Sequence, residues 1–142
     1  MIYKTIIGIS QALKEEFKES CVVFNEEEQE LKSSCFLIVP TKYEQKQKLG
    51  NRYELLQSFE IRYIPLNAKE YTLECANVMP KLFATLEYIT IDGDLTRGTN
   101  MSAQIQDGML HFFVDFNLFV LKVEERFNME TMQSGVLLKE GE

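Results

Sequence analysis

The sequence has little of what enzyme and cofactor sites are built from. Its only histidine, His111, precedes Asp115 by four residues on a predicted strand, which separates them by roughly 13 Å and excludes a local acid–base pair. The seven glycines are scattered and form no phosphate-binding loop, and no serine lies in a nucleophile elbow. We therefore predict no catalytic residue and no cofactor, and interpret His111 as a packed or interface residue.

Metal-ligand patterns are also missing. The three cysteines, Cys21, Cys35 and Cys75, are odd in number, have no CxxC spacing and lie in apolar surroundings. We interpret them as small buried hydrophobic residues of a reducing compartment. A zinc site needs four ligands, and the acidic run at residues 25–32 lacks the spacing of a calcium loop. We predict no metal site and interpret this run as a solvated connector.

Positive charge and long apolar runs are scarce as well. The formal net charge is −7, which argues against a nucleic-acid surface as the main function. No stretch approaches the apolar length of a membrane span, and the N-terminal residues are too polar for a signal peptide. With 45% hydrophobic and 26% charged residues in 142, the composition is that of one soluble globular domain.

The most informative segment that is present is residues 100–120. Asp107-Gly108 accepts the positive φ angles of a tight hairpin turn. On both sides of the turn apolar residues alternate with polar ones, which predicts two long strands. The apolar positions are Met101, Ala103 and Ile105 before the turn, and Leu110, Phe112, Val114, Phe116, Leu118 and Val120 after it.

The N-terminal half is predicted to hold one helix and several strands. An apolar stripe with helical spacing covers residues 2–17, and a short strand follows at residues 21–24. Residues 35–39 predict a buried strand that ends at Pro40. Residues 41–51 are polar and are interpreted as the loop of a long hairpin, where contacts to partners tend to be made. The alternating residues 52–64 form its second strand.

A second amphipathic helix is expected to begin near Glu70 and to contain Pro80. Either the helix curves with Pro80 on its solvent side, or it restarts at that residue. Asp92-Gly93 and Gly98 are interpreted as turns. The predicted fold is therefore α+β, a mostly antiparallel sheet with two helices packed on one face. Residues 1–123 form the domain, and residues 124–142 a C-terminal extension that docks on a neighbour.

Several motifs together resemble the phage tail terminator family of Gram-positive prophages and of phage-tail-like bacteriocins, R-type tailocins such as diffocin-like particles. The resemblance extends almost from end to end, and the DGMLHF segment is its most specific part. Ser34, Ile64 and Pro80 depart mildly from the family pattern. The matching segments are residues 35–38 (CFLI), 49–53 (LGNRY), 59–65 (FEIRYIP), 107–112 (DGMLHF), Arg97-Gly98 with Met101, and Met129-Glu130.

The resemblance implies a structural protein with the tail-terminator fold. Such proteins form a ring, usually a hexamer, at the head-proximal end of the tail tube and stop its polymerisation. The implied partners are the tail tube protein, the sheath protein in a contractile tail and a neck or connector protein where a head exists. DNA is only passing cargo, and no membrane is involved. Assembly in the bacterial cytoplasm would precede incorporation into the particle.

The interface candidates are positive residues near the motifs and apolar residues of the extension. They are Arg52, Arg97, Lys46, Lys48, Phe127, Met129 and Met132. For Arg52 and Arg97 the alternative is a local salt bridge to a nearby carboxylate. Two other functions stay open from the sequence. One is another neck or head–tail completion protein, and the other is a small cytosolic ligand-binding or enzymatic domain.

Overall fold

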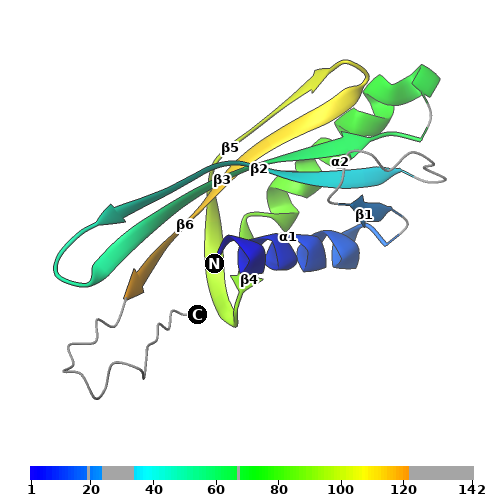
Figure 1. Ribbon diagram of the computed structural model, residues 1–142. Helices are drawn as coiled ribbons and strands as arrows, with labels where there is room; N and C mark the ends of the chain where they lie inside the picture. The colour runs from blue at the N-terminus through cyan, green and yellow to red at the C-terminus, as the bar shows by residue number, and fades with distance from the viewer. Residues whose placement is uncertain (19, 24–33, 67, 122–142) are drawn as a thin grey trace.

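A computed structural model describes residues 1–18, 20–23, 34–66 and 68–121. Within these residues the protein is α+β, as predicted, with two α-helices, one short 3-10 helix and six strands (Figure 1). Along the chain they are α1 (Ile2–Glu16), β1 (Cys21–Val23), β2 (Cys35–Gln47), β3 (Arg52–Ile64), η1 (Ala68–Glu70), α2 (Tyr71–Thr85), β4 (Tyr88–Ile91), β5 (Asp94–Gln106) and β6 (Met109–Leu121).

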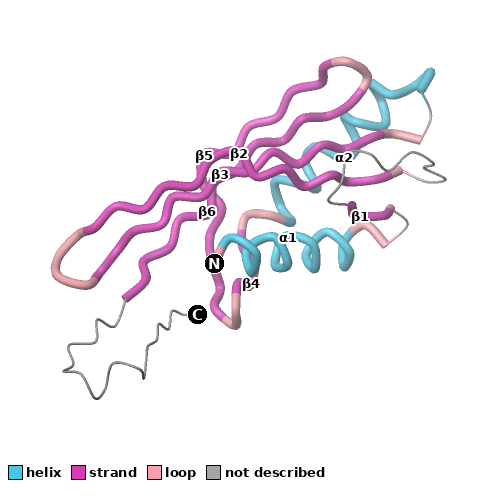
Figure 2. The backbone as a smooth tube through the Cα atoms, viewed as in Figure 1, coloured by secondary structure: helices cyan, strands magenta, loops and turns pink. Residues whose placement is uncertain are grey.

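The strands form one strongly twisted sheet in the order β1-β2-β3-β6-β5-β4 (Figure 2). The pair β1–β2 is parallel, and every other pair of neighbours is antiparallel. β3 and β6 occupy the centre and pair with each other from Arg52↔Leu121 to Tyr63↔Leu110. The two long hairpins, β2–β3 and β5–β6, are therefore joined side by side into one surface.

The hairpin predicted at Asp107-Gly108 is confirmed. The two residues have φ angles of 57° and 75° and connect β5 to β6. On β6, Leu110, Phe112, Val114 and Phe116 are all at most 1% exposed, while the residues between them are half-buried. The period-two pattern of the sequence thus marks the core face of the central strand.

Both helices pack on that same face of the sheet. Ile9 and Leu13 of α1 and Cys75 and Leu82 of α2 are fully buried in one core cluster with the sheet residues. α2 runs through Pro80 without restarting, and Pro80 is exposed, as the curved-helix interpretation requires. The missing N–H of proline is tolerated on the solvent side of a helix.

The prediction that a strand ends at Pro40, with a loop at residues 41–51, is wrong. β2 continues through Pro40 to Gln47, so only residues 48–51 connect it to β3. Pro40 lies at a register shift between Pro40 and Lys42, where the ladder to β3 is interrupted. Proline is compatible with such an irregularity on a strand whose other side has no partner among the described strands. The polar sequence reflects exposure, because this half of β2 has no helix over it.

The interpretation of all three cysteines as free thiols is also wrong. Cys21 and Cys35 form a disulfide. The parallel pairing of β1 with β2 places them at the same register position, with Cα atoms 4.6 Å apart. No local spacing signals this, because the two residues meet only through strand pairing. Cys75 is free and buried, as expected, and burial raises the pKa of its thiol, with Glu74 adding to the effect.

Gly98 was expected to mark a turn, but it lies inside β5 and is buried. A Cβ at this position would lie 2.5 Å from the carbonyl oxygen of Leu86 and 2.9 Å from Val114 Cγ2. The Gly98 N–H donates a hydrogen bond of 2.7 Å to the Glu87 carbonyl. The glycine thus allows the chain after α2 to pack directly against β5, where a larger residue has no space.

We expect Gly98→Ala to lower the free energy of unfolding by about 1–3 kcal/mol, because the added methyl overpacks a backbone contact. Urea denaturation measures this directly. Ser102→Ala, on an exposed position of the same strand, is the matched control and should change stability little. Equal stability of Gly98→Ala and wild type would show that the close packing has room to relax.

Candidate functional site

The most exposed part of the fold is an arm that extends beyond both helices (Figures 1 and 2). We define the arm as residues 43–56 of the β2–β3 hairpin together with residues 117–121 of β6, which pair with it. α1 contacts β1, β2 and β4, and α2 contacts β4, β5 and β6. The arm is thus a three-stranded ribbon held to the core mainly through its own strands.

The tip of the arm is ordered by short hydrogen bonds. The Lys48 N–H donates to the Arg52 carbonyl at 2.8 Å, and Gln47 Nε2 donates to the Gly50 carbonyl at 2.8 Å. Gly50 has a φ of 60°, which glycine adopts at little cost. These two hydrogen bonds and the glycine close the turn between β2 and β3.

Three of the predicted interface residues meet at this tip. Lys46 lies opposite Glu54 in the β2–β3 register, and Lys48 Nζ lies 3.3 Å from Glu54 Oε1. Arg52 begins β3 and is exposed. Lys46 and Lys48 therefore lie beside Glu54, and Arg52 comes two residues before it on the same strand, in a chain whose net charge is −7. The structure brings these candidates together, and their role at an interface stays a prediction.

Large apolar side chains lie beside these charges. Leu49, Phe119 and Leu121 are 81%, 66% and 57% exposed. Arg52, Phe119, Val120 and Leu121 line an open hollow of about 390 Å³. Exposed aromatic and aliphatic residues next to arginine are typical of surfaces that bind another protein. The sequence predicted Arg52 as an interface residue. It did not predict that Phe119 is exposed, because Phe119 lies within an apolar strand.

Arg97 does not join this group. It lies on β5, where its guanidinium carbon is 5.9 Å from the centre of the Tyr88 ring and Arg97 Nη2 is 4.0 Å from Glu87 Oε2. These contacts match the alternative of a local salt bridge. The remaining candidates, Phe127, Met129 and Met132, lie outside the described residues, as does the acidic run at residues 25–32.

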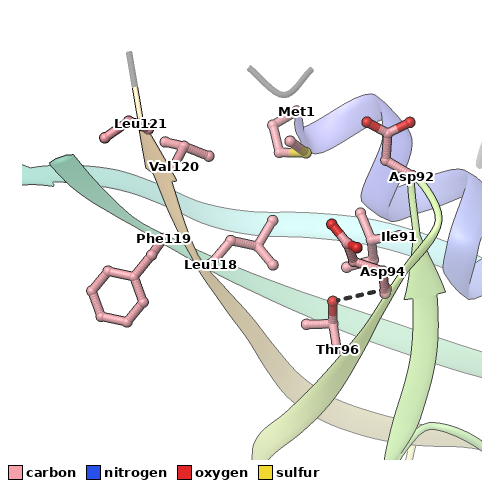
Figure 3. A pocket seen from close by; sticks show the side chains of 9 residues that line it. All are labelled: Met1, Ile91, Asp92, Asp94, Thr96, Leu118, Phe119, Val120 and Leu121. Atoms are coloured by element: carbon pink, nitrogen blue, oxygen red, sulfur yellow. Dashed lines mark hydrogen bonds between the residues drawn. The ribbon is translucent and has the colours of Figure 1, made fainter. Parts of the chain in front are cut away.

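A second hollow, of about 250 Å³, lies between the β4–β5 turn and the end of β6 (Figure 3). Leu118 and Val120 line it from one side, with Met1 and Ile91 across from them. Asp92 lies at its edge and forms an ion pair with Lys4 at 3.0 Å. Its lining is mainly apolar, and the described residues hold no group of His, Cys, Asp or Glu suited to a metal ion.

His111 belongs to a polar cluster on the sheet face opposite the helices. Its Nδ1 lies 2.6 Å from Glu60 Oε2, and its Nε2 lies 3.2 Å from the Gln106 carbonyl oxygen. Arg62 Nε donates to the same Glu60 oxygen at 3.0 Å. Burial alone would raise the pKa of Glu60, but the hydrogen bonds and charges of Arg62 and His111 outweigh it, so the pKa is lowered.

Another polar contact fixes α2 to the sheet. Tyr63 Oη donates to Glu74 Oε2 at 2.7 Å, and the Leu66 N–H donates to the same oxygen at 3.1 Å. Burial, followed by the hydrogen bond to Glu74, raises the pKa of Tyr63 to about 12. The tyrosine therefore stays protonated and serves as a structural donor. Tyr63, one residue of the motif at residues 59–65, thus has a structural role.

The exposed apolar and charged residues of the arm are suited to contacts with other proteins. The family to which the chain belongs is consistent with such contacts. A profile of the family described as phage tail terminator protein matches residues 5–128, and the chain belongs to that family. This is a family of structural proteins that act together with other components of the tail. No described helix has the length and apolar character to cross a membrane.

The other comparisons add little. No curated protein is similar enough to the chain to count as a relative. One solved structure aligns over 89% of this chain and 99% of its own, with 10% identity and a TM-score of 0.37. A likeness of that size supports no argument about shape or function.

Glu60 gives a pH prediction. Because its pKa is lowered in the folded state, its contribution to stability is present above the unfolded pKa of about 4.3 and is lost as pH falls through the folded pKa. We expect Glu60→Gln to be less stable than wild type at pH 6 and to lose less stability on acidification to pH 3. Urea denaturation at both pH values, with Glu15→Gln at an exposed position of α1 as control, measures this. Parallel pH profiles for Glu60→Gln and wild type would contradict it.

Proposed function

We propose that this protein is a tail terminator that assembles into a closed ring, with six subunits the expected number, at the head-proximal end of a tail tube. The observation that carries the proposal is the family match across residues 5–128. The exposed arm supports it, because an arm that extends beyond its own core is suited to reach a neighbouring subunit or the tube.

The proposed partners follow from this position in the particle. The ring binds the tail tube protein and stops its polymerisation, anchors the last sheath ring if the tail is contractile, and meets a neck protein if a head is present. DNA passes through it as cargo, and the net charge of −7 would limit adhesion to the DNA backbone. The particle is either a phage or a headless bacteriocin of a Gram-positive host, and assembly takes place in the host cytoplasm.

We assign the contact with the tube or a neighbouring subunit to the tip of the arm. Lys46, Lys48 and Arg52 give the tip a local positive charge, and Leu49 and Phe119 add exposed apolar area. A partner surface with carboxylates around an apolar centre would complement it. Residues 124–142 are proposed as an extension from the domain of residues 1–123 that reaches a neighbour.

The experiment that tests the proposed function is the native mass of the full chain, measured alone and with the tail tube protein of the same particle. We expect a closed ring near six subunits, formed either by the chain alone or only on tube ends. A chain that stays monomeric in both samples would contradict the terminator function. A ring that binds a portal-side neck protein and ignores the tube would indicate a neck completion protein.

The arm makes a separate prediction. We expect Arg52→Glu to give tails of uncontrolled length, because the reversed charge opposes the contact at the arm tip. Tail length measured by electron microscopy of assembled particles reports the effect. Lys14→Glu, on an exposed position of α1, is the control and should give tails of normal length. Normal tails with Arg52→Glu would remove Arg52 from the interface.

A further inference from the structure

The sheet has two long edges that no described strand covers. β4 pairs with β5 only from Asp94 to Arg97, and β1 pairs with β2 only from Cys35 to Leu37. Beyond these short pairings, no strand among the described residues lies outside residues 99–106 of β5 or residues 38–47 of β2. Each segment therefore presents backbone N–H and C=O groups that could pair with a further strand, except that Pro40 of β2 has no N–H. Lys42 and Lys46 also lie on the β2 segment, so β2 is the more protected of the two edges.

The free edge of β5 lacks the usual protection of an exposed strand. Residues 99–106 (TNMSAQIQ) contain no charged residue and no proline, whereas natural edges are commonly blocked by lysine or proline. A bulge interrupts the ladder between Thr99 and Ser102, and pairing with β6 is regular from Ser102 to Gln106. Met101, Ala103 and Ile105 are only partly buried at this edge. An edge with these properties is suited to accept a strand.

The strand directions identify a compatible strand within the same chain. β2, β3, β6 and β5 alternate in direction, so β2 and β5 run in opposite directions at the two edges. When a second copy is placed beside the first by rotation about an axis to which the strands are tilted, as in a barrel, its β2 lies antiparallel to the first copy's β5. The alternation continues unbroken from copy to copy. Such a head-to-tail contact leaves new free edges at both ends and closes only as a ring.

We propose that subunits join through β5 and β2, with residues 99–106 of one copy adding a strand to residues 38–47 of the next. This inference rests on the proposed ring and deepens it by naming the surface between subunits. The outer faces are compatible, because Ser102, Gln104 and Gln106 are uncharged donors and acceptors for Lys42, Glu44 and Lys46. On the helix side, Tyr43, which is 47% exposed, would cover apolar residues of β5.

The register adds a constraint on how the copies align. Residues 99–106 of β5 run beside β6 from Met109 to Asp115, whereas residues 38–47 of β2 correspond, through β3, to β6 from Phe112 to Val120. Neighbouring copies are therefore staggered along the strands by about four residues, roughly 13 Å. A ring with this stagger closes only if the strands tilt against the ring axis, as they do in a barrel. The short strands β1 and β4 cover the adjoining parts of these edges and limit further sliding.

Cysteine cross-linking tests the contact. Gln104→Cys on the β5 edge is combined in turn with Lys42→Cys, Glu44→Cys or Lys46→Cys on the outer face of β2, and the full chain is oxidised after its native mass is measured, alone and with the tail tube protein. Cys21 and Cys35 are already bonded and Cys75 is buried, so wild type gives the background. The control combines Gln104→Cys with Leu49→Cys, which is more exposed at 81% but lies outside the proposed pairing.

We expect at least one edge pair to lose its monomer band to a ladder of covalent multimers, and the Leu49 control to remain monomeric. If the native mass shows a ring but no edge pair gives covalent multimers, the β5–β2 contact is overturned and the proposed function remains. A covalent dimer from Gln104→Cys alone would overturn it too, because it shows β5 paired with itself. A native monomer with and without tube protein would reject both the contact and the terminator function.

Discussion

The structure depends on the pairing of β6 with β3 and β5 along most of its length. Because side chains alternate between the two faces of a strand, a slip of one residue would turn Phe112 and Phe116 from the core to solvent. That penalty fixes the register of both hairpins at once. The same face receives the helices, as the edge-to-face contact of Phe83 with Phe112 shows, with ring centres 5.0 Å apart. This one register determines which residues lie in the core, how far the arm extends, and which strand segments no described strand covers.

A buried polar residue lies where the helix-covered core gives way to the arm. Gln57 is 0% exposed, and its Oε1 accepts a hydrogen bond of 3.1 Å from Thr5 Oγ1 of α1. Its Nε2 donates to the Phe116 carbonyl at 3.1 Å. A buried amide is tolerated when its donors and acceptors are paired, and here it ties the start of α1 to both central strands. Towards the tip from Gln57 no described helix extends over the sheet (Figure 1), and the exposed Leu49, Phe119 and Leu121 lie in this part.

The features of this protein that are suited to a function are exposed surfaces, the arm and the sheet edges. Contacts through such surfaces agree with a family of structural proteins. The polar clusters around Glu60 and Glu74 hold their partners within the fold, and each motif residue in them has a packing explanation. Gly98 allows close backbone packing, and Asp107-Gly108 adopts the positive φ angles of the hairpin turn, so these motif residues also have structural roles. The family motifs thus specify a sheet with a projecting arm and open edges. Of the motif residues, Leu49 and Arg52 are exposed at the tip of the arm, and they are the ones proposed to meet another subunit or the tube.

The sequence by itself determined the elements whose signal is local. Period-two alternation specified β3 and β6, helical spacing specified α1 and α2, and Asp107-Gly108 specified the hairpin, because each pattern follows from the backbone geometry of a single element. Only the tertiary structure decided the rest. Residues 41–47 are a strand because they pair with β3. Cys21 and Cys35 form a disulfide because β1 and β2 pair in parallel, and Arg97 contacts Glu87 and Tyr88. These outcomes depend on which distant segments lie side by side, and no local pattern records that.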